Sequence, residues 1–297
     1  MRSDGNQSAL AGLLLSMPAF VGLAAFVAMP FLAAVILSCT DAQLNSPLAM
    51  RFVGTEQYRR LLSDPMIRRA LANNLVFAAV VVPVQTVLAL LLAVLLELVP
   101  SGKRLFRVLL FLPVVFPMSL IAVVWILLYA PGETGPMNRV LSWLTLGGWE
   151  PRDFLRDPQL AFPAIILLSL WQGVGLQMVI LSAALSRIPK ELYEAAAIDR
   201  AGAFAQFRHI TLPQLRNPLV FTMLLTTILA FRLFEQVRIM THGGPGDATR
   251  TLLLQAVESA FDLQQIGEAS ALSVVLFCIV LCISVLQQVL LDEGRRS

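Results

Sequence analysis

Long apolar runs separated by short polar segments form the dominant pattern of the chain. Five runs contain no charged residue, at positions 5–40, 70–96, 108–132, 158–186 and 269–291. Each is longer than the about 18 apolar residues that a helix needs to cross the hydrocarbon core of a bilayer. Because lipid offers the backbone no hydrogen-bond partners, each run is expected to be helical. A sixth, shorter run at 217–231 is followed by Arg232 and Glu235.

This pattern predicts an all-α polytopic membrane protein with six transmembrane helices, in a single domain over residues 1–297. The expected spans cover residues 10–38, 70–96, 106–130, 159–185, 216–236 and 264–291. The first span is too long for the apolar core of a cleaved signal peptide, so we expect a retained anchor. An even number of spans places both termini on the same side of the membrane.

Composition agrees with a membrane protein. Hydrophobic residues make up 57% of the chain and charged residues 14%, about half the charged share that is usual in soluble domains. Three cysteines, Cys39, Cys278 and Cys282, are too few for a disulfide framework, and we interpret them as small apolar packing residues. Lys and Arg are divided almost evenly between the loops of the two sides. Charge alone therefore does not orient the protein.

One polar, alanine-rich loop interrupts the apolar pattern between the fourth and fifth spans. Pro189 suits the first position of a helix, and the residues up to Arg200 are mostly good helix formers. Gly202 offers a break, after which residues 203–211 are expected to form a second short helix that ends at Pro213. The residues alone leave two interpretations open: the loop docks on another protein, or it folds against its own membrane helices.

The loop carries two short motifs, Glu194-Ala195-Ala196 and Ile210-x-Leu212-Pro213. Together they resemble the EAA loop of ABC importer permeases. The flanking sequence, IPKELYEAAAID and FRHITLP, is similar in particular to the sugar-type permeases, the family of the maltose and glycerol-3-phosphate importers. The segments at 241–261 and 267–276 also resemble that family, so the resemblance extends along most of the chain.

The resemblance implies that the loop over residues 186–217 forms the coupling helices that sit in a groove of a cytoplasmic ATPase. The residues to which it assigns this role are Glu194, Ala195, Ala196, Asp199, Arg200, Gly202, Ile210, Leu212 and Pro213. The family usually has glycine where this chain has Arg200. Either Gly202 takes over the turn, or Arg200 adds a charge to the interface.

The resemblance also implies partners and a location. The expected partners are a second, homologous permease subunit, a cytoplasmic ATPase dimer, an extracytoplasmic solute-binding protein and the lipid bilayer, but no nucleic acid. The chain is expected to be a multi-pass protein of the bacterial inner membrane with both termini in the cytoplasm.

Catalytic motifs are absent from the sequence. It contains no G-x-x-x-x-G-K-[ST] phosphate loop, no zinc-site spacing and no nucleophile elbow. We therefore expect no enzymatic activity, and no cofactor or metal in this chain. ATP and Mg²⁺ are expected on the partner ATPase.

Polar residues inside the spans are the candidates for a solute path, because ionisable groups are costly in lipid. Arg232 and Glu235 are three residues apart on the fifth span, so they either form an interfacial ion pair or line the path. Trp171, Gln172 and Gln177 in the fourth span combine aromatic and amide groups that suit a sugar ring, or else they serve helix packing.

Two further groups of span residues have weaker signals. Asn73, Asn74 and Gln85 in the second span are minor candidates for the path. Trp125 and Tyr129 lie one turn apart near the outer end of the third span, and we expect them in the aromatic belt at the membrane surface.

The function predicted by the sequence is that of the permease subunit of an ATP-driven, binding-protein-dependent importer. It would translocate a sugar or sugar-like solute into the cytoplasm by alternating access. A secondary transporter driven by an ion gradient is one alternative, although the spans contain almost no acidic residues at their centres. An ABC permease for another small solute, such as an amino acid, is the other, and the sugar-type flanking residues disfavour it.

Overall fold

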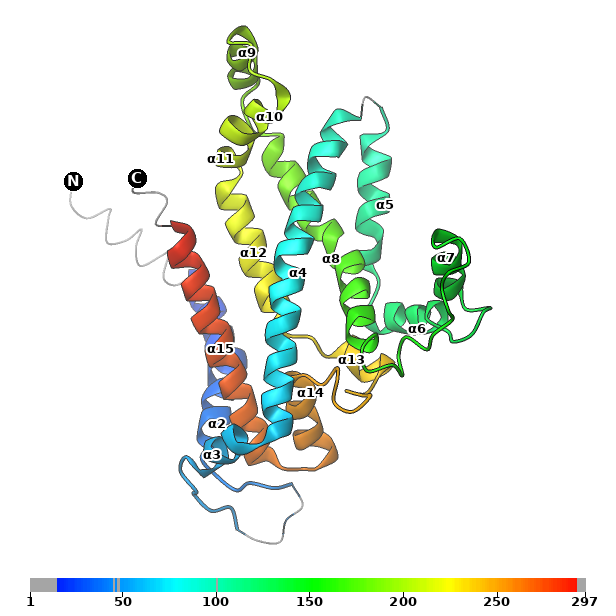
Figure 1. The fold of residues 1–297 in the computed structure, drawn as a ribbon. Coiled ribbons are helices and arrows are strands. Elements are labelled where there is room, and N and C mark those ends of the chain that lie inside the picture. The colour runs from blue at the N-terminus through cyan, green and yellow to red at the C-terminus, as the bar shows by residue number, and fades with distance from the viewer. Residues whose placement is uncertain (1–14, 45, 47–48, 100, 293–297) are drawn as a thin grey trace, which may run out of the picture. The chain divides into compact units, whose positions relative to one another are not determined.

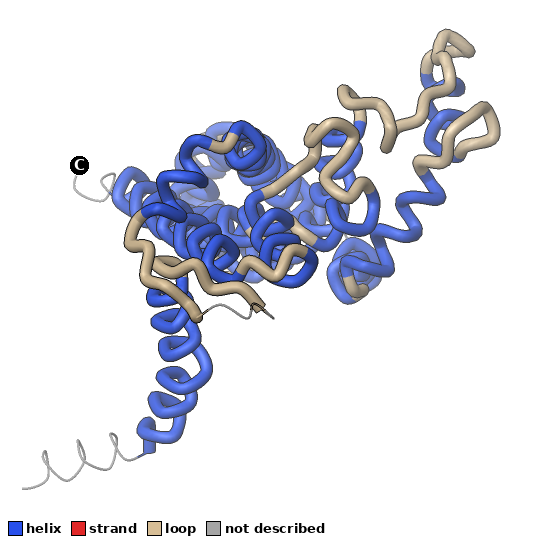
Figure 2. Tube along the Cα trace, turned by 90° about the horizontal axis from the view of Figure 1, so that it is seen from below, coloured by secondary structure: helices blue, strands red, loops and turns tan. Residues whose placement is uncertain are grey.

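The fold is helical throughout. The structure, a computed structural model, describes residues 15–44, 46, 49–99 and 101–292. Within these ranges, helices are joined by loops, and the sole β-type pairing is an isolated antiparallel bridge between Thr40 and Phe52 (Figure 2). The predicted all-α fold is confirmed.

Five helical segments are long and apolar enough to cross a membrane. They are Leu15–Leu37, which includes α2 (Met29–Leu37); Pro65–Leu98 (α4); Ala161–Leu185 (α8); Arg216–Met240, which includes α12 (Arg216–Phe231) and α13 (Glu235–Met240); and Ile266–Val289, within α15 (Ile266–Asp292). A bent helix pair makes a sixth span if it is counted as one. The predicted start of the first span, at residue 10, lies outside the described residues.

The third span differs from its prediction as one continuous helix over 106–130. It consists of α5 (Lys103–Val115) and α6 (Met118–Leu128), which are bent by 97° relative to each other. Phe116 between them is extended, with φ −78° and ψ 141°. The cause is Pro117, because proline disfavours the helical conformation of the residue before it.

The described residues form two compact units. The first takes residues up to Asp64 together with Gln255–Phe277, and the second takes Pro65–Leu254 together with the residues from Cys278 onward. In the first unit the N–H of Gly267 donates to the carbonyl oxygen of Ala42 at 3.0 Å. A Cβ atom on Gly267 would lie 2.2 Å from another backbone oxygen, so only glycine allows this approach.

Close packing of α4, α5, α8 and α12 organises the second unit (Figure 1). The helix α4 packs along both α8 and α12, and α5 packs on α8. A Cβ atom on Gly175 of α8 would lie 2.2 Å from the carbonyl oxygen of Leu110 in α5. The missing side chain at Gly175 therefore lets these two backbones touch.

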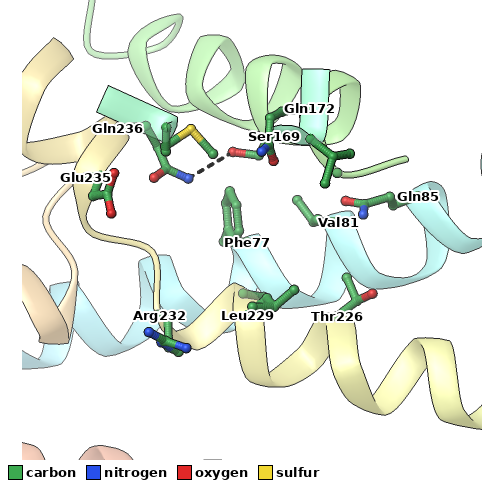
Figure 3. Close-up of a pocket in the computed structure, with 14 residues that line it drawn as sticks. Phe77, Val81, Gln85, Ser169, Gln172, Thr226, Leu229, Arg232, Glu235 and Gln236 are labelled. Atoms are coloured by element: carbon green, nitrogen blue, oxygen red, sulfur yellow. Dashed lines mark hydrogen bonds between the residues drawn. The ribbon is translucent and has the colours of Figure 1, made fainter. Parts of the chain in front are cut away.

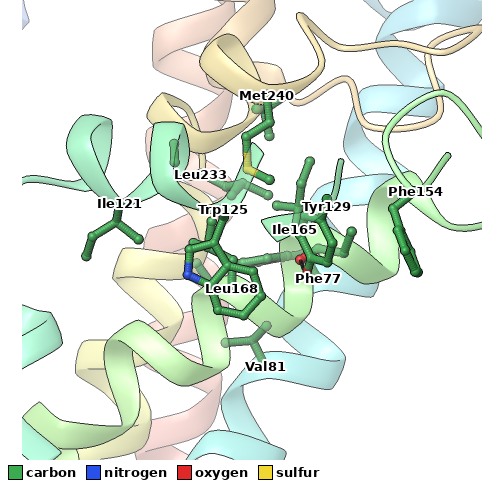
Figure 4. Close-up of a cluster of buried hydrophobic side chains, with 14 of the residues drawn as sticks. Phe77, Val81, Ile121, Trp125, Tyr129, Phe154, Ile165, Leu168, Leu233 and Met240 are labelled. Atoms are coloured by element: carbon green, nitrogen blue, oxygen red, sulfur yellow. Dashed lines mark hydrogen bonds between the residues drawn. The ribbon is translucent and has the colours of Figure 1, made fainter. Parts of the chain in front are cut away.

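The main apolar core of the second unit contains the two aromatic residues that we expected in the lipid-facing belt (Figure 4). Trp125 and Tyr129 are only 7% and 2% exposed, so the expectation was wrong. The Tyr129 hydroxyl donates to the carbonyl oxygen of Ala164 at 2.9 Å. The bend before α6 is the physical reason, since α6 packs against α13 instead of continuing along the line of α5.

Candidate functional site

The loop between α8 and α12 folds into two helical segments joined by a tight turn. The first is α9 (Lys190–Ile198), which follows Pro189 at its N-cap. The second combines α10 (Ala203–Gln206), a π-helical turn (Phe207–Thr211) and α11 (Leu212–Gln214), and it leads into α12. Figure 1 shows α9 beyond the ends of α8 and α12. We refer to residues 189–214 as the two-helix module.

Each motif residue has a defined place in the module. Glu194, Ala195 and Ala196 lie in α9, Asp199 and Arg200 in the turn, Gly202 at the N-cap of α10, Ile210 in the π-helical turn, and Leu212 and Pro213 in α11. All are exposed except Ala196 and Ile210, which are half-buried. Two large apolar side chains of the module, Ile198 and Phe204, are 82% and 76% exposed. The module therefore presents apolar as well as charged surface to its surroundings.

Arg200 itself adopts the turn conformation that glycine favours. Its φ is +58°, in the left-handed region, and the N–H of Ala201 donates to the carbonyl oxygen of Ala196 at 2.9 Å across the turn. Gly202 has an ordinary φ of −68° and does not take over this role. The alternative in which Gly202 takes over the turn is therefore wrong.

Pro213 does not end the second helix, contrary to the prediction. A proline lacks the N–H that would continue the α-helical pattern and its ring crowds the preceding turn. Here the preceding residues widen into a π-helical turn, in which the N–H of Leu212 donates to the carbonyl oxygen of Phe207. The hydrogen bond spans five residues instead of four, and this wider turn accommodates Pro213, so the chain continues through α11 toward α12.

A cavity of about 320 Å³ lies among the membrane helices of the second unit (Figure 3). Residues of α4, α8, α12 and α13, with Val114 of α5 and Met118 of α6, surround it. Its lining residues are Phe77, Val81, Gln85, Val114, Met118, Ser169, Gln172, Gly173, Thr226, Leu229, Ala230, Arg232, Glu235 and Gln236.

The two candidate charges of the fifth span both line this cavity but do not pair. The span is interrupted between α12 and α13, so Arg232 follows one helix and Glu235 starts the next. Within the described part of the chain, neither side chain forms an ion pair or hydrogen bond, so the predicted pair is wrong. The interruption is stabilised by Thr251, whose hydroxyl donates to the carbonyl oxygen of Leu233 at 2.9 Å.

Amide side chains supply most of the remaining polar lining. Gln85 is only 6% exposed, and its amide has no hydrogen-bond partner among the residues that the structure describes. Gln236 donates to the hydroxyl of Ser169 at 3.3 Å, and Gln172 lies on the same side of the cavity as Ser169 (Figure 3). Thr226 adds a hydroxyl group. The cavity is thus lined by groups that both donate and accept hydrogen bonds.

Sequence reasoning found only part of this lining. It identified Gln172, Arg232 and Glu235 and gave Gln85 less weight, but it missed Phe77, Ser169, Thr226 and Gln236. The available signal was a polar residue inside an apolar span, as at Thr226. Phe77 carried no such signal.

Two predicted path residues lie outside the cavity lining. Trp171 is 46% exposed, and its ring centroid lies 5.6 Å from that of Trp125. Gln177 is 1% exposed and donates its amide hydrogen to the hydroxyl of Thr226. Gln177 therefore joins α8 to α12, which matches the packing alternative for this residue.

Asn73 and Asn74 also lie outside the cavity lining, and they bind residues 247–252 instead, which form the end of the loop after α13 and the first residue of the next helix. The Asn73 amide donates to the carbonyl oxygens of Asp247 and Arg250, at 3.1 and 2.9 Å. The Asn74 side-chain oxygen accepts a hydrogen bond from the N–H of Leu252 at 2.9 Å. Their role is to attach this loop to α4.

Metal-ligating side chains do not gather in the described residues, which contain no group of three or more His, Cys, Asp or Glu suited to a metal ion. The polar groups described above line the cavity, belong to the two-helix module, or join structural elements, as Asn73, Asn74 and Gln177 do.

The helical spans, the polar cavity among them and the exposed two-helix module together define the membrane component of a transport system. The chain belongs to the family described as "binding-protein-dependent transport system inner membrane component", whose sequence pattern matches residues 69–293. It is 36% identical over 294 residues to the probable ABC transporter permease protein YurN of Bacillus subtilis, covering 98% of this chain and 99% of that protein.

Two further comparisons extend this result. The chain is 32% identical over 277 residues to the sulfoquinovosyl glycerol transport system permease protein SmoG of Agrobacterium fabrum, covering 93% of this chain and 88% of that protein. Its fold is similar to that of a chain in the crystal structure of a bacterial ABC transporter involved in the import of the acidic polysaccharide alginate. The TM-score is 0.80 at 19% sequence identity, with 97% of this chain and 96% of that chain covered.

Proposed function

We propose that the chain is the permease subunit of an ATP-driven importer that brings a sugar or sugar-like solute into the cytoplasm. The family supports binding-protein-dependent transport. The sulfoquinovosyl glycerol transport of SmoG and the alginate import of the structurally similar transporter support a carbohydrate-containing solute. The observation that carries the proposal is the exposed two-helix module, which presents the EAA-type motif residues at the end of the membrane helices.

The two-helix module is the surface that binds the ATPase. Ile198 and Phe204 expose apolar area that a partner groove can bury, and Glu194 supplies a charge next to the small residues Ala195 and Ala196. ATP and Mg²⁺ are held by that partner. The module therefore faces the cytoplasm, and with six spans both termini face it as well.

The cavity is the part of the solute path that this chain supplies. Its volume of about 320 Å³ is at the lower end of the range of small-molecule sites, about 300–1,000 Å³. The amides of Gln85, Gln172 and Gln236 match sugar hydroxyl groups, which both donate and accept hydrogen bonds. The Phe77 ring offers an apolar face in the same cavity.

Transport proceeds by alternating access. ATP closes the ATPase dimer, the two-helix module moves with it, and the membrane helices turn the cavity from the cytoplasmic to the extracytoplasmic side. Solute affinity must differ between the two states, because only a difference in affinity lets ATP drive accumulation. A second, homologous permease completes the path, and an extracytoplasmic solute-binding protein delivers the solute.

Affinity purification from membranes tests this function. The tagged chain is purified in a mild detergent, and the co-purifying chains are identified by mass spectrometry. We expect a second permease and an ATPase with a phosphate loop. A chain that purifies alone and transports solute in response to an ion gradient in liposomes would instead establish a secondary transporter.

A further inference from the structure

We propose that Tyr193 is a positioning residue that transmits the movement of α9 to the membrane helix α12 through Thr211. This inference rests on the proposed function, because it specifies how the two-helix module acts once an ATPase holds it. It assigns to Tyr193 a role that is distinct from contact with the ATPase.

The geometry of the two hydroxyl groups is the starting point. The Tyr193 hydroxyl oxygen lies 2.9 Å from the hydroxyl oxygen of Thr211, although the residues are 18 positions apart. Thr211 is only 6% exposed, and Tyr193 is half-buried. Water therefore competes little for this hydrogen bond. It is the only side-chain hydrogen bond that joins α9 to the second helical segment within the described residues.

Thr211 is connected by its backbone to the start of α12. Its carbonyl oxygen accepts a hydrogen bond from the N–H of Leu215 at 3.0 Å, and the Leu215 oxygen accepts one from Leu219 at 2.8 Å. Leu215 is fully buried, so this junction is packed against the membrane helices. A displacement of Thr211 thus acts directly on the end of α12, and α12 carries Thr226 and Leu229 of the cavity.

Along the chain, the turn at residues 199–202 connects α9 to the second helical segment. At one end of the turn, the N–H of Ala201 donates to the carbonyl oxygen of Ala196. At the other end, the side-chain amide of Gln206 donates to the carbonyl oxygen of Ala201 at 3.0 Å. A single chain crossing can act as a hinge. The contact between Tyr193 and Thr211 closes a ring that includes this hinge, so that the two segments move as one body.

Tyr193 and its neighbour Glu194 have different roles on α9. Successive residues of an α-helix point about 100° apart, so Tyr193 and Glu194 occupy different faces. Glu194 is exposed on the surface available to the ATPase, whereas Tyr193 turns toward Thr211. The helix α9 thus has one face for docking and another for transmission.

The test uses the complete purified complex in proteoliposomes, with a reporter cysteine in the cavity. Cys39, Cys278 and Cys282 are replaced by alanine, and Gln172 is replaced by cysteine. Some complexes are inserted with their ATPase outside the vesicle. A membrane-impermeant maleimide added outside reaches the cavities of these complexes, and external ATP with vanadate acts only on them. With Tyr193 present, nucleotide trapping should protect the cysteine.

Removal of the hydroxyl by Tyr193→Phe should reduce this ATP-dependent protection at least threefold, while ATP hydrolysis stays within twofold and the ATPase still co-purifies. Thr211→Val should have the same effect, Thr211→Ser should retain protection, and the double variant Tyr193→Phe with Thr211→Val should be no worse than either single change. The matched control is Ser186→Ala, since that hydroxyl bonds only the carbonyl oxygen of Ala183 in its own helix.

The outcomes separate the inference from the function on which it rests. Full protection in Tyr193→Phe, or additive losses in the double variant, would overturn the role of Tyr193 and leave the importer intact. If the complex with Tyr193 shows no response to ATP, or contains no ATPase, the proposed function itself fails.

Discussion

Asn73 in α4 donates a hydrogen bond from its side-chain amide to the carbonyl oxygen of Arg250, 177 residues further along the chain, at 2.9 Å. The next residue, Asn74, accepts one from the N–H of Leu252. These contacts attach the loop after α13 to α4. This loop follows α13, and α13 begins with Glu235 of the cavity.

Replacement of Asn74 by alanine should destabilise the protein by about 1–3 kcal/mol, because the N–H of Leu252 would be left buried without a partner. The midpoint of thermal unfolding in detergent should fall. Asn217→Ala is the matched control, since Asn217 is exposed. Equal midpoints for the two variants would contradict the attachment of the loop by Asn74.

Replacement of Arg200 by glycine should stabilise the turn by up to about 1 kcal/mol, because Arg200 has a positive φ that costs energy for a residue with a side chain. Amide hydrogen exchange of residues 195–201 should slow. Gly202→Ala should change little, since a Cβ atom there meets nothing within 4 Å. Weaker binding of the ATPase by Arg200→Gly would show that the arginine charge belongs to the interface.

Replacement of Arg232 by alanine should reduce transport at least tenfold without lowering the amount of protein in the membrane. The same should hold for Glu235→Ala, because each charge faces the cavity independently. The double variant should recover nothing, whereas partners in an ion pair would compensate for each other. Uptake in whole cells measures this, with the exposed Arg59→Ala as control. Normal uptake by Arg232→Ala would remove this residue from the path.

Replacement of Gly175 by alanine should cost about 1–3 kcal/mol, because the new Cβ would lie 2.2 Å from the Leu110 backbone oxygen and α5 would have to move away from α8. Gly173→Ala should cost less, since the atoms in its way belong to the side chain of Gln85, which can shift. Thermal unfolding in detergent compares the two. An equal or larger loss for Gly173→Ala would contradict the close contact of α5 and α8.

Replacement of Glu194 by lysine should uncouple or disassemble the complex while membrane insertion remains normal, because Glu194 is exposed on the docking face of α9. Uptake should fall in either case, and ATPase co-purification should fall as well if the complex disassembles. Glu191→Lys reverses a charge on the same helix outside the EAA motif, and it should have a smaller effect. Full transport by Glu194→Lys would count against docking at this residue.

The sequence predicted the apolar helices well, because the cost of unpaired backbone groups in lipid leaves few alternatives. It also located the module, because a charged, alanine-rich stretch is conspicuous between apolar spans. The predictions were wrong at two prolines, where the conformation of the neighbouring residues decides whether the helix continues. Pro117 bends the third span by 97°, whereas Pro213 is absorbed by a π-helical turn, and no local pattern distinguishes these two outcomes.

Tertiary contacts determine the roles of the polar residues in the spans. Asn73, Gln85 and Gln177 looked alike in the sequence, as amides within apolar helices. In the structure one binds a loop, one lines the cavity and one joins two helices. These assignments depend on segments that lie far apart in the chain, and the periodicity of a single span carries no information about them.

Photo-crosslinking from the two-helix module in living cells tests the central claim most directly. A photoreactive phenylalanine analogue replaces Ala195 in α9, and the crosslinked chains are identified by mass spectrometry. The same analogue at Leu146, which is 96% exposed, is the control. We expect an ATPase crosslinked to position 195 and absent from position 146. Crosslinks from position 195 to this chain alone would show that the module folds against its own membrane helices, and would contradict the coupling role.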